Sequence, residues 1–568
     1  MNKSFKVVFN KARGALMVVN EVTSSVQAKG TKTVIAAAVA ALAAGGVAAA
    51  ESEWVGAPED LESVEANQAW EDVKDQNRFD WAPVAEKETP GTFLSTSEKK
   101  TFDKTLWVSG NTAAAQATGL AVSGAQGDLT NKGTIYVTSG KNGVSYQNKG
   151  IWAGNGATAT NEGVIVAKNA YGMTVGTEES GANASKIVNK GTIYVEETGV
   201  GMELGGYSGS KAENRGTIVV GTPTTGVDVE GGSLRFGHGV LIQDSSNNVF
   251  TNYDTIEAAD GASAIEVKTT GTATAGNTLN FEAGSKVVGE VHIASGITGT
   301  VLNANGFDGT IDLNNQSDDL ELNVVKGAEV TLEEGNKSKV AVANIKDGRL
   351  NASIWGDDTK FSKVNVEENG VFNVTKLNST WDDPATEEDE AKAEGAKKDQ
   401  LLIKGADYTL NGGKLYAAGE NFVGNLKIGT NSEKGTLTIT KGDYKYENVR
   451  LGNLTKTAGA STLTVEGGSL TVTGLLDLRY GRTTVDGGKL ALEGDYLVGD
   501  RKDTLAVKSG TFATSGANLF EVKAETQAEE AAGDETTGEE ENPAAPKYEV
   551  SDLLANNAAQ MTGGIIEV

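Results

Sequence analysis

Short runs of alternating apolar and polar residues recur along the chain, and each run follows a glycine. The segment NKGTIYV at 131–137 returns as NKGTIYV at 189–195, with looser copies NEGVIVA at 161–167 and NRGTIVV at 214–220. Each copy predicts a short strand, because β-branched and aromatic side chains favour extended backbone. The copies begin 30, 28 and 25 residues apart, and a nearly regular period in this range indicates stacked repeats.

Further short strands lie between these copies. GVGMEL at 199–204 and GVDVEG at 226–231 are examples, and no helix-length periodic segment separates them. Two or three short strands in every 25–30 residues describe one coil of a solenoid. The pattern therefore predicts an all-β chain folded as a right-handed parallel β-helix.

The repeated residues have distinct predicted roles. Glycine turns the corner by adopting positive φ, and asparagine tolerates that conformation and bonds its own backbone. Stacking would create an internal or edge asparagine ladder and an aliphatic core column. The residues are Asn131, Asn161, Asn189 and Asn214; Gly133, Gly163, Gly191 and Gly216; and Ile135, Ile165, Ile193 and Ile218.

The second half uses a related pattern. Segments 410–417, 465–472, 485–492 and 507–514 place a Gly-Gly or Ser-Gly pair before a strand, which extends the predicted β-helix over 101–520. The charged segments 381–400 and 521–550 are poor in strand formers and predict solvated loops. Residues 551–568 end in MTGGIIEV, which predicts the start of a further coil, so we expect the natural chain to continue.

The first hundred residues differ from the rest. Four basic residues lie among the first thirteen, and an uncharged, alanine-rich run covers 34–50. That run ends in Ala48 and Ala50 before Glu51, so residues 1–50 predict an extended secretory signal peptide cleaved after Ala50. Residues 51–100 predict a short N-terminal helical or irregular cap, because 60–79 space apolar side chains at roughly helical intervals.

The opening MNKSFKVVFNKARG resembles the extended signal peptide region of type V secreted proteins. The matching residues are Asn2, Lys3, Phe5, Lys6, Val7, Phe9, Asn10, Lys11, Gly14, Val18, Val19 and Glu21. The resemblance implies a Gram-negative cell, export by the Sec machinery, and delivery through the periplasm to the cell surface or outer membrane, with or without release.

Three branches of that family share such a leader. Two-partner secreted proteins usually carry an N-P-N-G motif after the signal, and this sequence has none. Trimeric adhesins carry heptad stalks, and this sequence has no sustained heptads. It resembles a classical autotransporter with a β-helical passenger. This resemblance implies an outer-membrane β-barrel translocator, which we expect downstream in the full-length gene.

The amino-acid composition excludes several classes of partner and site. The chain has 77 acidic and 50 basic residues, and its net charge of −27 argues against nucleic acid or anionic lipid. It has 72 glycines and only 7 prolines, which suits short strands and tight corners. It has no cysteine, which excludes disulfides, thiolate zinc sites and cysteine nucleophiles.

Catalytic motifs are missing from the sequence. There is no G-x-S-x-G, G-D-S-G-S, G-D-S-L or H-E-x-x-H segment. His238 and His292 stand 54 residues apart and predict ordinary surface or turn residues. The acidic group in 306–323 (Asp308, Asp312, Asp318 and Asp319) predicts a polar turn and strand.

We therefore expect no catalytic residue, cofactor or metal site. The predicted function is an adhesin or surface-interaction protein directed at an unknown ligand on host cells, matrix or other bacteria. The alternative is a glycan-active enzyme on the same β-helix, which a group of acids with an arginine in one outer groove would favour.

Overall fold

The computed structural model describes residues 5–10, 15–20 and 92–567, the last range with gaps. The gaps are 111–116, 140–147, 177–183, 207, 222–226, 229–233, 236, 336–337, 355–357, 377–399, 404–405, 431–432, 453–460, 479–480, 500–504, 515–519, 524–546, 549–558 and 562–564. The cleavage residues Ala48, Ala50 and Glu51, the helix expected at 60–79, and nearly all of the 381–400 loop lie outside the described residues.

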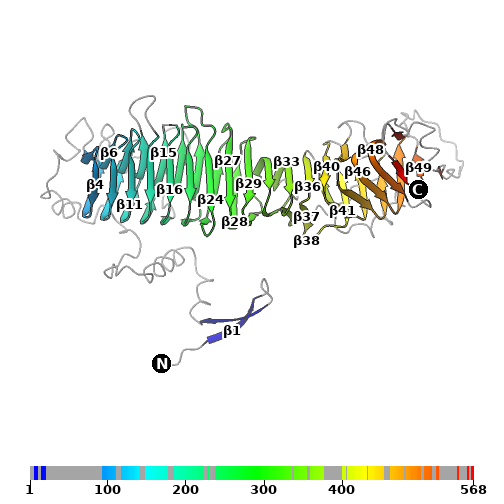
Figure 1. Ribbon diagram of the computed structural model, residues 1–568. Helices are drawn as coiled ribbons and strands as arrows, with labels where there is room; N and C mark the ends of the chain where they lie inside the picture. Colours follow the sequence, from blue (N-terminus) through cyan, green and yellow to red (C-terminus); the bar gives the residue numbers. More distant parts are fainter. Residues whose placement is uncertain are drawn as a thin grey trace, which may run out of the picture. The chain divides into compact units, whose positions relative to one another are not determined.

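The chain divides into two compact units. Unit 1 comprises Met1–Ile242 and Asp254–Glu266, and unit 2 comprises Gln243–Tyr253 and Val267–Val568. Each unit contains parallel sheets whose strands succeed one another coil by coil (Figure 1), which confirms the predicted all-β parallel β-helix. The described residues contain no helix, and thus none long and apolar enough to cross a membrane.

Three parallel sheets run along the described part of unit 1. The first contains β3 (Thr92–Thr96), β6 (Thr118–Ser123), β9 (Lys149–Gly154), β12 (Tyr171–Gly176), β15 (Val200–Gly205) and β20 (His238–Gln243). The second contains β4 (Lys99–Phe102), β7 (Asp128–Asn131), β10 (Thr158–Asn161), β13 (Lys186–Asn189) and β16 (Lys211–Asn214). The third contains β5 (Thr105–Gly110), β8 (Thr134–Ser139), β11 (Val164–Lys168), β14 (Thr192–Glu196), β17 (Thr217–Val220) and β22 (Thr255–Ala258). β3 and the start of β4 thus lie inside the segment 51–100 that was predicted as a cap.

Unit 2 has a main sheet that begins at β21 (Val249–Asn252) and β24 (Thr278–Glu282). It continues through β27 (Thr300–Asn305), β29 (Leu320–Val325), β31 (Ser338–Ile345), β33 (Thr359–Glu367), β36 (Asp407–Asn411), β40 (Thr436–Lys441), β43 (Ser461–Val465), β46 (Gly481–Leu492) and β48 (Leu505–Thr514). The strands β41 (Asp443–Tyr446) and β44 (Ser469–Val472) pair with each other, and β44 pairs with the second half of β46.

Two further sheets complete unit 2. The side sheet contains β26 (Glu290–Ile293), β28 (Asp308–Asn315), β30 (Ala328–Leu332), β32 (Gly348–Ala352), β34 (Val371–Val374) and β37 (Lys414–Ala417). The C-terminal sheet contains β35 (Gln400–Ile403), β39 (Asn425–Ile428), β42 (Asn448–Leu451), β45 (Leu475–Asp477), β47 (Asp495–Gly499) and β49 (Phe520–Lys523).

The ends of unit 2 include parts of the predicted loop and the predicted further coil. From the loop segment 521–550, the structure describes the end of β49 and also β50 (Lys547–Tyr548), which pairs antiparallel with β49. From the segment 551–568 it describes β51 (Ala559–Met561) and β52 (Ile565–Glu567), and both lie parallel to β48. In the signal segment, β1 (Phe5–Asn10) pairs antiparallel with β2 (Ala15–Asn20).

The core of unit 1 is built from columns of like residues. Ile135, Ile165, Ile193 and Ile218 are in-register partners on the third sheet, and each is fully buried. Leu106 precedes this column and Ile256 follows it, also in register and buried. Stacking thus supplies each coil with the apolar neighbours that it cannot supply to itself.

The corner asparagines lie inside unit 1 as one ladder. Asn131, Asn161, Asn189 and Asn214 are in register and fully buried. The side chain of each of the first three donates to the next: Asn131 Nδ2 to Asn161 Oδ1 at 2.8 Å, then Asn161 to Asn189 and Asn189 to Asn214 at 2.9 Å each. Asn214 Nδ2 donates to the Thr255 carbonyl oxygen at 3.1 Å. The ladder supplies the hydrogen bonds that buried amides need.

The prediction of positive φ at the corner glycines was wrong. Gly133, Gly163, Gly191 and Gly216 are not among the residues with positive φ. A Cβ on Gly163 would lie 2.0 Å from the Gly133 carbonyl oxygen, and one on Gly191 would lie 2.0 Å from that of Gly163. Glycine is required here because the backbone of the preceding coil approaches too closely for any side chain.

Candidate functional site

The acidic group of residues 306–323 does not converge on one point. Asp318 forms an exposed ion pair with Lys339 at 2.7 Å, and Asp319 Oδ2 accepts the Gly299 N–H at 2.9 Å. Asp308 and Asp312 lie on β28, where Asp308 is exposed and Asp312 is half-buried. Within the described residues, no three His, Asp or Glu side chains are grouped so that they could hold a metal ion.

The predicted placement of His238 was wrong. The side chain is 7% exposed on β20, and its Nε2 lies 2.9 Å from Glu266 Oε2. Leu241 of the same strand packs in a buried apolar cluster with Tyr171 and Val200, so this part of the first sheet is covered. His292 lies on β26 and is half-buried, so it does not occupy a turn.

Three charged side chains form a buried row on the C-terminal sheet of unit 2. Lys427, Arg450 and Asp477 are in-register partners on β39, β42 and β45. Arg450 Nε donates to Asp477 Oδ2 at 2.9 Å, and the two side chains are 9% and 1% exposed. A buried charge needs such a partner. The row joins an acid and an arginine, but its burial closes it to a polysaccharide.

Glu196 of unit 1 has a strongly raised pKa. It ends β14 opposite Lys168 of β11. Burial raises the pKa of Glu196 to about 7, although the nearby charge of Lys168 lowers it, and Glu197 raises it further. Because burial is the largest of these causes and outweighs the charge of Lys168, the shift follows from desolvation at the end of a strand.

Asp244 fastens a loop of unit 2. Its Oδ1 accepts the N–H groups of Thr270 at 2.7 Å and Gly271 at 3.0 Å, and its Oδ2 accepts the Thr270 hydroxyl at 2.5 Å. Partial burial acts to raise the pKa of Asp244, but these hydrogen bonds outweigh it and hold the pKa well below its usual range. Apart from the adjacent Gln243, whose Nε2 donates to Oδ2 at 3.2 Å, the partners belong to one local turn, which indicates a structural anchor.

The main sheet of unit 2 carries an uncharged polar row on its outer face. Nine in-register residues alternate with buried core positions, and we name them the outer polar row. They are Asn280, Asn303, Asn323, Asn344, Asn365, Thr409, Thr438, Thr464 and Thr484. At the strand spacing of about 4.8 Å, eight steps make a row of about 38 Å.

The asparagines of this row are linked by side-chain hydrogen bonds. Asn303 Nδ2 donates to Asn280 Oδ1, Asn323 to Asn303, and Asn344 to Asn323, each at 2.9 Å. Unlike the corner ladder, these residues are half-exposed. The bonds fix the amide orientations, and the half-exposed asparagine and threonine side chains of the row lie on the outer side of the sheet.

Sequence reasoning missed this row, although a signal exists. Asn280, Asn303, Asn323, Asn344 and Asn365 recur every 20 to 23 residues. Each follows or precedes an apolar residue within a strand-like run, as in TLNFE, VLNAN and ELNVV. The recurrence at the coil period was the observable sign of a stacked outer position.

Comparison with known proteins supplies the export route. Residues 1–50 match the family model described as the extended signal peptide of the type V secretion system. Residues 111–234, which contain the corner asparagine ladder, match the model described as the BigA third pectate lyase-like domain. The two matches are consistent with an autotransporter passenger.

The chain thus combines a segment that matches a type V secretion signal with a β-helix that in part matches a pectate lyase-like domain. The signal implies Sec export across the envelope to the surface and a β-barrel translocator in the full-length protein. No curated protein and no solved structure matches the chain significantly.

Proposed function

We propose that this passenger is an adhesin whose outer polar row contacts ligands on host cells, matrix or other bacteria, and that it is not an enzyme. The observation that carries the proposal is the outer polar row itself. It presents amides and hydroxyls at the coil spacing over about 38 Å, which suits an extended ligand with repeating polar groups.

The outer polar row itself contains no carboxyl group, and Glu321 on the same face is engaged by it, since Glu321 Oε1 accepts from Asn323 and Asn344 at 3.0 and 3.2 Å. Hydrolysis of a glycosidic bond ordinarily needs two carboxyl groups flanking the bond, and general acid–base catalysis needs a titrating group within hydrogen-bond reach of the substrate. The outer polar row contains only asparagine and threonine. The described Arg450–Asp477 pair is buried, so a polymer cannot reach it. These features favour binding over catalysis.

The test is binding of the exported protein to an array of glycans and matrix proteins, with polysaccharide cleavage scored on the same samples. We expect binding without cleavage. Replacing Thr409, Thr438, Thr464 and Thr484 with valine keeps the side-chain shape and removes the outward hydroxyls. Array binding should fall at least tenfold, because the free energy of about one lost hydrogen bond is enough for a tenfold weaker affinity.

Thr483→Val is the matched control for that variant. Thr483 adjoins Thr484 on β46, but it is fully buried and faces the core. Its loss should leave array binding unchanged. Release of reducing sugar by the exported protein, or unchanged binding by the outward valine variant, would overturn the proposal.

A further inference from the structure

A positively charged edge interrupts the acidic character of unit 1. On the second sheet, Leu129, Ala159, Ile187 and Ala212 face the core and are fully buried. The alternate positions of these strands, and the residues that follow them, face outward. Five of these outward residues are cationic, and we name them the basic edge: Lys132, Lys186, Lys190, Lys211 and Arg215.

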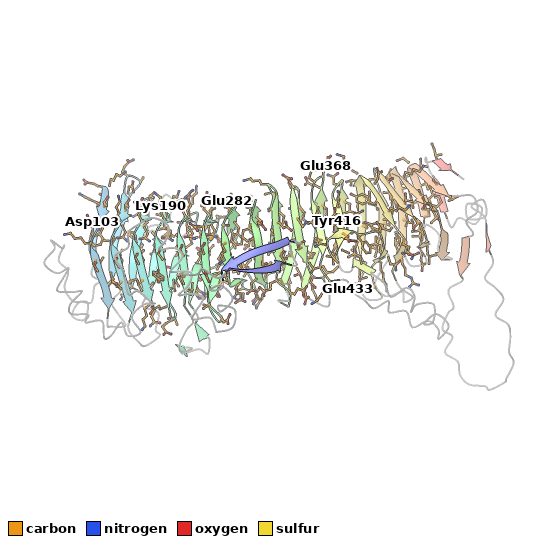
Figure 2. All side chains as sticks on the ribbon, turned by 90° about the horizontal axis from the view of Figure 1, so that it is seen from below. Asp103, Lys190, Glu282, Glu368, Tyr416 and Glu433 are labelled. Atoms are coloured by element: carbon orange, nitrogen blue, oxygen red, sulfur yellow. The ribbon has the colours of Figure 1, made fainter. Side chains whose placement is uncertain are left out.

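Register groups these cations into two rows. Lys186 of β13 pairs with Lys211 of β16, and Lys190 and Arg215 directly follow the paired residues Asn189 and Asn214. Lys190 lies at an outer edge of its coils (Figure 2). Lys211 is about 4.8 Å from Lys186 along the coil axis, and Arg215 is the same distance from Lys190. Lys132 lies two coils, or about 9.6 Å, from Lys190, and the rows are about 13 Å apart, four residues along a strand.

Two carboxylates lie among the five cations, and each is shared. Glu162 contacts Lys132 at 3.8 Å and Lys190 at 3.2 Å, whereas Glu213 contacts Lys186 at 2.6 Å and Arg215 at 2.8 Å. The basic edge and these two carboxylates therefore sum to 5 − 2 = +3. The side chains of Lys132, Lys190 and Arg215 are 56%, 49% and 42% exposed.

These ion pairs do not neutralise the edge. Exposed pairs contribute little free energy and exchange readily for other partners. Partial burial acts to raise the pKa of Glu213, but the hydrogen bonds from Lys186 and Arg215 outweigh it and lower that pKa, so Glu213 stays ionised and fixes both cations in place. The edge thus holds preorganised positive charge that an anionic ligand can share.

The chain as a whole carries −27, which repels polyanions from most of its surface. The basic edge is a local exception to this charge, at which an anionic ligand can bind. None of the outward residues on β10, β13 and β16 is aromatic. Proteins that hold nucleic acid strands use aromatic platforms for the bases, whereas a sulfated sugar needs only cations and hydrogen-bonding groups such as Thr158.

We propose that the basic edge of unit 1 binds a sulfated polysaccharide. This inference rests on the proposed adhesive function and names one ligand class for it, on a surface separate from the outer polar row. The sulfate groups would replace the shared carboxylates as partners of Lys186, Lys190, Lys211 and Arg215. Binding would weaken as salt rises, because the contacts are exposed and the screening length is about 8 Å at physiological ionic strength.

The experiment measures binding of the exported protein to immobilised heparin, a heavily sulfated polysaccharide, over a series of salt concentrations. Lys190→Gln with Lys211→Gln removes two cations from the edge. At about fivefold for each cation near an anionic surface, the double variant should bind roughly 25-fold more weakly and show a shallower dependence on salt.

The matched control is Lys339→Gln with Lys346→Gln in unit 2. These lysines are 45% and 53% exposed, and each forms one exposed ion pair, with Asp318 and Glu367 respectively. The control changes the net charge by the same amount, and it should alter heparin binding less than twofold. Hydrogen exchange should be unchanged in residues 184–195 of the edge variant and in residues 338–345 of the control, which verifies both folds.

Three results would overturn the inference: no heparin binding at low salt, an equal loss in the control, or equal competition by desulfated heparin. Competition by DNA or polyphosphate as strong as by heparin would likewise overturn the assignment to sulfated glycans. If the exported protein does not bind heparin but still binds ligands on the glycan and matrix array, the proposed function stands and only this inference fails. If the exported protein binds nothing on the array, the proposed function is overturned instead.

Discussion

Replacing Asn161 with alanine should loosen unit 1 far more than the same change at Asn323 loosens unit 2. Both residues accept one ladder bond and donate another, at 2.8 and 2.9 Å for Asn161 and at 2.9 Å each for Asn323. Asn161 and its neighbours are fully buried, whereas Asn323 and its neighbours are half-exposed. Each Nδ2 also donates to another acceptor, to the Gly163 carbonyl oxygen at 3.2 Å from Asn161 and to Glu321 Oε1 at 3.0 Å from Asn323. The pair therefore compares a buried ladder amide with a half-exposed one.

The magnitude follows from what each substitution leaves behind. Without Asn161, Asn189 Oδ1 loses its ladder donor in a dry interior, and an unsatisfied buried group costs about 1–3 kcal/mol. The lost volume adds to this, so we expect about 3 kcal/mol for Asn161→Ala. Water replaces the missing partner around Asn323, and the expected cost there is about 0.5–1 kcal/mol.

Hydrogen–deuterium exchange with mass spectrometry measures both effects locally. Exchange in β10 and β13 should accelerate roughly 100-fold in Asn161→Ala, whereas exchange in β29 and β31 should accelerate less than about fivefold in Asn323→Ala. Equal acceleration in the two variants would refute the reasoning, because the buried ladder would then contribute no more than the exposed one.

Three further predictions concern single side chains. Gly163→Ala should destabilise unit 1 by about 2–3 kcal/mol, since its Cβ would displace the Gly133 carbonyl oxygen that accepts the Val164 N–H at 3.0 Å. Gly221→Ala should be tolerated, because its Cβ would be 3.6 Å from its nearest neighbour. Equal urea midpoints for the two variants would contradict this difference. Because the folded-state pKa of Glu196 is raised to about 7, unit 1 should lose about 1–2 kcal/mol as pH rises from 4.5 to 7; Glu196→Gln should abolish that slope in chemical denaturation. Thr483→Val should stabilise unit 2 by about 1 kcal/mol, because its buried hydroxyl has no hydrogen-bond partner among the described residues; a lower denaturation midpoint would disprove this.

The repeat pattern made the coils predictable because stacking imposes one chemical demand at each corner. An asparagine must recur at the coil period to bond the asparagine of the next coil, and an isoleucine must recur to pack on the isoleucine of the next coil. The reason for the corner glycines was not predictable, since it depends on the distance between the backbones of successive coils. Sequence alone supplies the choice of glycine but not the contact that requires it.

Features that depend on tertiary packing were harder to predict from the sequence. The buried row of Lys427, Arg450 and Asp477 alternates with apolar residues, as exposed charges do, so its burial depends on tertiary packing. The basic edge was hidden by averaging, because a net charge of −27 describes the whole chain and not one face. Its cations become neighbours only when residues 25 to 30 apart are placed in register.

The most direct test of the account is adhesion of bacteria that display this chain at equal surface density, with and without the four outward threonine-to-valine changes in the outer polar row. The account predicts that the unaltered protein attaches cells to host cells, matrix or one another, and that the valine variant loses most of that attachment while Thr483→Val does not. Equal adhesion by the unaltered protein and the outward valine variant would contradict it.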